Sequence, residues 1–188
     1  MTLFHFSDEP DIEIFTPRPV RIPVERPGGQ EWLNGPLVWA IDAWHEPLYL
    51  FPRECPRILL WQTPETTEED RVAWFADSGA RMIAFVERGW LQRLASHTVY
   101  RYAFDPARFE DVADAGMWVS RFPETPLRID PLSDLPEQLA ARGVELRVED
   151  SLVPLKGLWQ TSLHASGIRL RNAAGWGPPG WPHSRTKT

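Results

Sequence analysis

Apolar residues occur along this chain in short runs of about five positions, separated by turns rich in proline, glycine and acidic side chains. Such runs are too short for most helices, and several alternate with polar residues, which is typical of β-strands. We expect strands at residues 2–6, 37–41, 57–61, 81–86, 99–104, 117–121, 127–129 and 145–148.

Helical signals are fewer. A helix is expected over 63–77, with Val72, Trp74 and Phe75 facing inward and Gly79 ending it. Short helices are also expected between 42 and 50, near 90–94, over 134–143 with Asp134 as cap, and over 151–172. Pro47 favours a start near residue 45 or 46 for the first of these, because proline is tolerated only in the first turn.

The order of these elements predicts an α+β fold rather than a doubly wound sheet, since strands and helices do not alternate regularly. We expect a single domain over 1–173, built of short, mostly antiparallel strands with flanking helices. Residues 16–31 contain four prolines and predict an extended surface loop. Residues 174–188, rich in glycine and proline, predict a flexible tail that adds nothing to the core.

Composition excludes several classes of protein. A net charge of −6 argues against nucleic-acid binding by charge, and no apolar run is long enough to cross a membrane. A single cysteine and the lack of a secretory signal favour the cytoplasm. Cys55 is expected to be a buried, inert thiol. A phosphate-binding glycine loop, a cysteine or histidine pair for zinc and a nucleophile elbow are all absent.

The segment 38–57 contains the densest group of candidate functional side chains. Asp42, His45 and Tyr49 have spacings that would share a helical face, but capping and packing explain them better than a metal site, which needs more ligands. Arg53 and Arg57 could grip a phosphate or pyrophosphate, or could pair with surface carboxylates.

His5, in the middle of the first strand, opens a second set of candidates. The order of a strand with His-x-Ser, a later tyrosine and a late glutamate resembles the ADP-ribosyltransferase superfamily. The resemblance implies that His5 binds the ribose of NAD, while the backbone beside Ser7 meets the nicotinamide amide. It also implies that Tyr49 stacks on nicotinamide and that Glu124 stabilises the oxocarbenium-like transition state.

The stretches LFHFSDEPDIEIFTPRP, EWLNGPLVWAIDAWHEPLYLFPRECPRILLW and SGIRLRNA also resemble a family of bacterial proteins of unknown function. Three hypotheses follow. The chain is an NAD-using enzyme of the ADP-ribosyltransferase type, in which Arg18, Arg53 or Arg57 attracts the anionic dinucleotide, or a nucleotide-binding module without catalysis. The third hypothesis is a protein-interaction module that uses exposed members of its ten tryptophans or the 16–31 loop.

Overall fold

The computed structural model describes residues 1–177 except 22, 24 and 27. It has an α+β fold with mostly antiparallel strands, as the sequence predicted, and its internal contacts divide it into two compact units. Unit 1 comprises residues 1–46 and 99–132, and unit 2 comprises 47–98 and 133 onward. The expected single domain over 1–173 stays a prediction, and each unit is described by itself.

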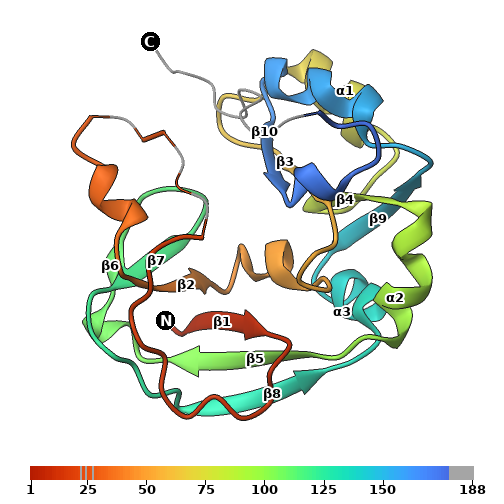
Figure 1. Ribbon diagram of the computed structural model, residues 1–188. Helices are drawn as coiled ribbons and strands as arrows, with labels where there is room; N and C mark the ends of the chain where they lie inside the picture. Colours follow the sequence, from red (N-terminus) through yellow and green to blue (C-terminus); the bar gives the residue numbers. More distant parts are fainter. Residues whose placement is uncertain (22, 24, 27, 178–188) are drawn as a thin grey trace. The chain divides into compact units, whose positions relative to one another are not determined.

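Unit 1 contains a six-stranded antiparallel sheet in the order β6-β7-β2-β1-β5-β8 (Figure 1). Its strands are β1 (Leu3–Ser7), β2 (Val38–Asp42), β5 (Val99–Phe104), β6 (Glu110–Asp111), β7 (Met117–Ser120) and β8 (Arg128–Leu132). A short 3-10 helix, η1 (Glu31–Asn34), precedes β2. Strand β1 is central, with His5 opposite Tyr102 of β5.

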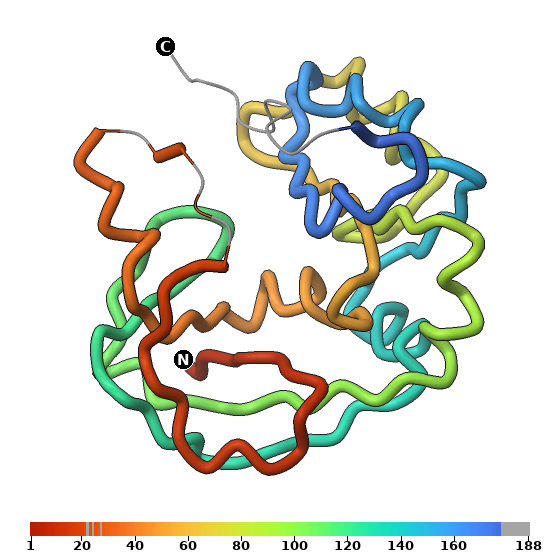
Figure 2. Tube along the Cα trace, viewed as in Figure 1, coloured from red at the N-terminus to blue at the C-terminus, as the bar shows by residue number. Residues whose placement is uncertain are grey.

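The pleat of β1 sends its residues alternately to two faces of the sheet. Leu3 and His5 share a face with Tyr102 and Phe104, and Phe15 from the segment after β1 covers that face. Backbone hydrogen bonds between Phe15 and Glu124 of 2.8 and 2.9 Å fix this segment. Figure 2 shows it in red, looping past the teal strand β8.

Unit 2 contains a four-stranded sheet in the order β10-β3-β4-β9. Its strands are β3 (Arg57–Trp61), β4 (Met82–Glu87), β9 (Val144–Glu149) and β10 (His164–Ile168), and only the β4–β9 pair is parallel. All residues of β3 and β4 are buried, as expected for continuous apolar runs.

The helices of unit 2 are short. The α-helices are α1 (Glu68–Phe75), α2 (Leu91–Ser96) and α3 (Leu135–Ala140). The 3-10 helices are η2 (Glu46–Tyr49), which begins one residue before the unit boundary, η3 (Arg88–Trp90), η5 (Val153–Gln160) and η6 (Leu170–Asn172). A further 3-10 helix, η4 (Pro106–Arg108), lies in unit 1. The expected cap at Asp134 and the start near residue 46 are confirmed.

Three expectations for unit 2 are wrong. The helix expected over 151–172 ends at Gln160, and residues 164–168 instead form β10, because they pair along the whole length of β3. Val72 is 48% exposed rather than inward, and α1 begins at Glu68, later than predicted. Trp176 is 3% exposed and packs in the core, so the tail does add to it there. Residues 178–188 of the predicted tail lie outside the described part.

Candidate anion-binding site

The register of β10 on β3 brings together two segments that are more than a hundred residues apart. Because the strands are antiparallel and Ile168 lies opposite Arg57, the residues after β10 run beside the residues before β3. Arg169, Arg171 and Asn172 therefore meet Arg53 and Glu54. We call these five residues the basic cluster.

Glu54 is the only carboxylate of the basic cluster. Its Oε2 accepts a hydrogen bond of 3.0 Å from Asn172 Nδ2, and its backbone oxygen accepts a second of 2.7 Å from the same amide. Arg171 Nη2 lies 3.4 Å from Oε2, and Arg169 Nε lies 3.7 Å from Oε1. The hydrogen bond from Asn172 and the charges of the arginines together hold the pKa of Glu54 below its ordinary value.

The two arginine contacts with Glu54 are long. A charge-assisted hydrogen bond between a guanidinium and a carboxylate is usually about 2.7–2.9 Å. Both arginine side chains are about one-third exposed, at 31% for Arg169 and 35% for Arg171. They are therefore loosely held by Glu54 and still accessible to a second anion.

Burial lowers the pKa of Arg169, and repulsion from Arg171 and Arg53 adds to the effect. Arg169 also has a left-handed backbone, with φ of +56°. This conformation costs a non-glycine residue about 1 kcal/mol, and strain of this kind is often found at functional sites. The chain thus keeps a strained arginine among like charges.

Arg57 is a buried arginine next to the basic cluster in the chain. It is 2% exposed, and its Nε and Nη1 atoms donate to the backbone oxygens of Leu48 and Cys55 at 2.9 and 3.0 Å. Its guanidinium lies 5.7 Å from the ring centre of Tyr49 and 5.0 Å from that of Phe51. Burial lowers the pKa of Arg57 to about 10.

Tyr49 lies beside Arg57, whose guanidinium is 5.7 Å from the centre of the Tyr49 ring, and Arg57 follows Arg53 and Glu54 closely in the chain. Of the predicted site residues, Tyr49, Arg53 and Arg57 therefore gather in one region of unit 2. Arg169, Arg171 and Asn172 were not predicted as site residues. Their local signal was the two alternate arginines of the SGIRLRNA stretch, and only strand pairing reveals their neighbours.

The other three predicted residues lie in unit 1. His5 Nδ1 is 2.8 Å from the backbone oxygen of Trp39, and its ring packs 4.8 Å from that of Phe15. A carbonyl oxygen can only accept, so Nδ1 carries the proton. Ser7 is 6% exposed and its hydroxyl accepts from the Glu9 amide at 3.1 Å.

Glu124 is also buried, at 6% exposure. Its Oε1 accepts a hydrogen bond of 2.6 Å from the Ser120 hydroxyl and lies 3.5 Å from Arg108 Nε. Glu124 and His5 both contact Phe15, the first through its backbone and the second through its ring. Phe15 thus links these two predicted residues within unit 1.

Asp42 and His45 form a pair, but not on a helix. Asp42 ends β2, and both of its carboxylate oxygens lie about 3 Å from His45 Nδ1, at 2.9 and 3.0 Å. The His45 amide also donates to Asp42 at 2.7 Å, so the carboxylate closes a tight turn. Gly116, with φ of +71°, passes so close that a Cβ there would lie 2.2 Å from His45 Nδ1.

Cys55 is fully buried, as expected. Burial, with a contribution from the Glu87 charge, raises the pKa of its thiol to about 12. Within residues 1–177, less the three undescribed positions, no three histidine, cysteine or carboxylate side chains are grouped so as to hold a metal ion. Nor does the described chain include a helix long and apolar enough to cross a membrane.

The chain is thus an α+β protein with a net charge of −6 that brings three arginines, Arg53, Arg169 and Arg171, together in its basic cluster. Its sequence matches the model of a family of unknown function, DUF6886, over residues 4–173, and the protein belongs to that family. No curated protein and no solved structure matches the chain.

Proposed function

We propose that this protein binds a phosphate-bearing nucleotide through the basic cluster of unit 2. The observation that carries the proposal is the concentration of Arg53, Arg169 and Arg171 around a single glutamate in a chain with a net charge of −6. Planar guanidinium groups match the oxygens of a phosphate in pairs. A local excess of cations on an acidic protein favours an anionic ligand at that place.

Tyr49 favours a nucleotide over a simple anion. An aromatic ring beside a cationic cluster provides one surface for a base or nicotinamide and another for phosphates. Arg57 lies over the Tyr49 ring and is itself held by two backbone oxygens. This arrangement would fix the ring without using the exposed cations, so Arg57 would position Tyr49 rather than bind phosphate directly.

From the sequence resemblance, as a hypothesis separate from the basic cluster, we further propose that the protein uses NAD and transfers its ADP-ribose group. The support is the resemblance of His5, Ser7, Tyr49 and Glu124 to the ADP-ribosyltransferase pattern. The proton on His5 Nδ1, directed at Trp39, leaves Nε2 as the acceptor of the neutral ring.

The second candidate is a nucleotide-binding module without catalysis. It is favoured by the contacts of Glu124, whose carboxylate is buried against Ser120 and faces Arg108. A carboxylate held in this way has a structural role in unit 1, which competes with a role in stabilising positive charge on a ribose.

The experiment is a calorimetric titration of the protein with pyrophosphate, ADP-ribose and NAD, together with a chromatographic assay of nicotinamide release. Arg171→Gln is expected to weaken all three ligands by about five- to tenfold, because one arginine near a phosphate contributes about 1 kcal/mol at an exposed site. Arg88→Gln is the matched control, since Arg88 is an exposed arginine of the same unit that pairs with Asp150.

The outcomes separate the candidates. Nicotinamide release that is abolished in Glu124→Gln supports the enzyme. Binding without release, unchanged in Glu124→Gln, supports the binding module. Absence of binding by pyrophosphate, ADP-ribose and NAD overturns the whole proposal.

A further inference from the structure

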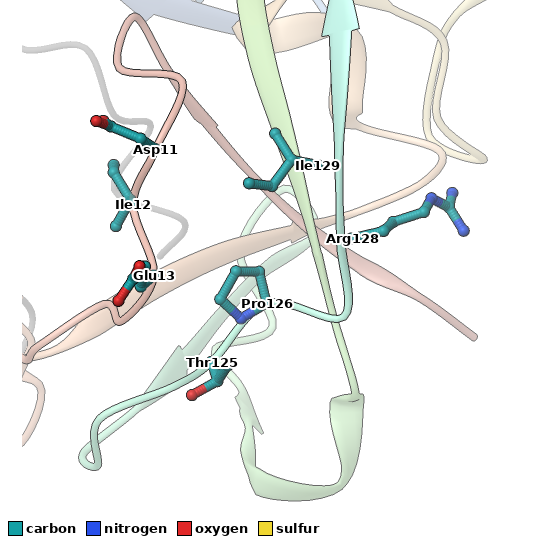
Figure 3. Close-up of a pocket in the computed structure, with 7 residues that line it drawn as sticks. All are labelled: Asp11, Ile12, Glu13, Thr125, Pro126, Arg128 and Ile129. Carbon is teal, nitrogen blue, oxygen red and sulfur yellow. The ribbon is translucent and has the colours of Figure 1, made fainter.

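Unit 1 has a groove whose lining residues include none of His5, Ser7 and Glu124, although Thr125 directly follows Glu124. It has a volume of about 540 Å³ and is lined by Asp11, Ile12, Glu13, Thr125, Pro126, Arg128 and Ile129 (Figure 3). Ile12, Pro126 and Ile129 give it an apolar lining. Its size lies in the range of known binding pockets, about 300–1,000 Å³. We call it the acidic groove.

One wall of the acidic groove is held in place by Tyr102, which is fully buried. The Tyr102 hydroxyl donates to the backbone oxygen of Glu9 at 2.5 Å and accepts from the amide of Ile12 at 3.1 Å. Backbone pairing between Phe15 and Glu124 ties the same wall to the segment that forms the opposite wall. The groove is therefore preformed, which lowers the entropic cost of binding.

The opposite wall is apolar and partly uncovered. Ile129 of β8 is 39% exposed, and in Figure 3 its side chain points toward the 11–13 segment. Strand β8 is the last in the order of its sheet, so it has a sheet neighbour on one side only. An exposed branched side chain at a sheet edge offers contact area to a partner.

The charge of the groove is negative. Asp11 and Glu13 are exposed, and no cation pairs with either carboxylate in the part of the chain that the structure describes. The lining cation, Arg128, is 3.2 Å from Asp130 and extends from the other side of β8 in Figure 3. Asp8 and Glu9, also exposed, precede these acids on the same segment.

We propose that the acidic groove binds an extended peptide in which arginine or lysine alternates with an aliphatic residue. The aliphatic side chains would pack on Ile12, Pro126 and Ile129, while the cations would meet Asp11 and Glu13. An anionic ligand is disfavoured by the two carboxylates. A second copy of this chain is disfavoured because it would bring another net charge of −6 to an acidic surface.

The test uses fluorescence polarisation with a labelled peptide in which arginine and leucine alternate, titrated with the whole protein. A matched peptide with glutamate in place of each arginine is the specificity control. The double substitution Asp11→Asn with Glu13→Gln is expected to weaken the basic peptide at least tenfold. Ile129→Ser is expected to weaken it severalfold, and its thermal unfolding reports whether the fold is kept.

A control pair, Glu69→Gln with Glu31→Gln, removes two exposed acids elsewhere and is expected to leave peptide binding within twofold. Addition of 0.5 M salt should weaken binding by the wild type more than binding by the double variant, because attraction between exposed charges is screened. Equal binding of the two peptides, or equal weakening by the control pair, would overturn the proposal. So would a dimer in sedimentation that Ile129→Ser dissociates, because a second copy would then occupy the groove.

Discussion

Replacing Glu54 by glutamine should raise the affinity of the basic cluster for phosphate, although the substitution removes an ion-pair partner of Arg169 and Arg171. A phosphate held by Arg169 and Arg171 would bring its charge within roughly 5 Å of the Glu54 carboxylate. Two unit charges at that distance repel by about 0.8 kcal/mol in water and by about 3 kcal/mol at the dielectric of a protein surface. Glu54 is 44% exposed, which favours the lower part of that range.

A pyrophosphate that places one or two charges near Glu54 would then lose about 1–2 kcal/mol to repulsion. Removing the carboxylate charge should therefore tighten pyrophosphate binding roughly five- to thirtyfold. The glutamine oxygen can still accept from Asn172, so the loop should keep its shape. The expected loss in the free energy of unfolding is below about 1 kcal/mol, as for other exposed ion pairs.

The assay is calorimetry with pyrophosphate at low salt, with Glu69→Gln as the control, because Glu69 is an exposed acid of the same unit outside the cluster. The gain should shrink at 0.5 M salt, where charges are screened beyond about 3–4 Å. An unchanged or weaker affinity in Glu54→Gln would refute the reasoning, because Glu54 would then organise the cluster rather than compete with the ligand.

Three further predictions concern single residues. Gly116→Ala places a Cβ 2.2 Å from His45 Nδ1 at a left-handed position, so urea unfolding should show that the free energy of unfolding falls by about 3 kcal/mol. Gly79→Ala is the control, because no atom lies within 4 Å of the new methyl group, and it should change the free energy of unfolding by less than about 0.5 kcal/mol. Equal effects of the two substitutions would contradict the packing described. Because burial raises its thiol pKa to about 12, Cys55 should react with a thiol reagent at pH 8 only after denaturation, and fast reaction of the native protein would show that the site is open. Arg169→Gly relieves the left-handed backbone strain, so the free energy of unfolding of this variant should change by less than about 1 kcal/mol, while its affinity for pyrophosphate falls about tenfold. A larger loss of stability together with the loss of affinity would mean that Arg169 is mainly structural.

Local pattern was sufficient for some of the short apolar runs. The sequence predicted β3 and β5 with their observed bounds, since both are short runs of branched and aromatic residues. It failed for β10, whose residues His164–Ile168 include glycine and serine and carry no strand pattern. They form a strand because β3 offers them an unpaired edge, and a distant pairing of that kind leaves no trace in local periodicity.

The candidate site, like the fold, could be predicted only where local sequence pattern was sufficient. Tyr49 and Arg53 were predicted from spacing and residue type within the 38–57 segment. Arg169 reaches the Arg53 backbone across 116 positions of sequence, so only the register of β10 on β3 identifies it. The sequence singles out His5 because it is a polar residue in an apolar strand, and its contacts with Trp39 and Phe15 explain it by packing as well.

The most direct measurement is the affinity of pyrophosphate for the wild type, Arg171→Gln and Arg88→Gln, determined by calorimetry under one set of conditions. The proposed function predicts saturable binding to the wild type, binding five- to tenfold weaker in Arg171→Gln, and wild-type affinity in Arg88→Gln. Equal binding by all three proteins, or no binding by the wild type, would contradict the assignment of the basic cluster as a phosphate site.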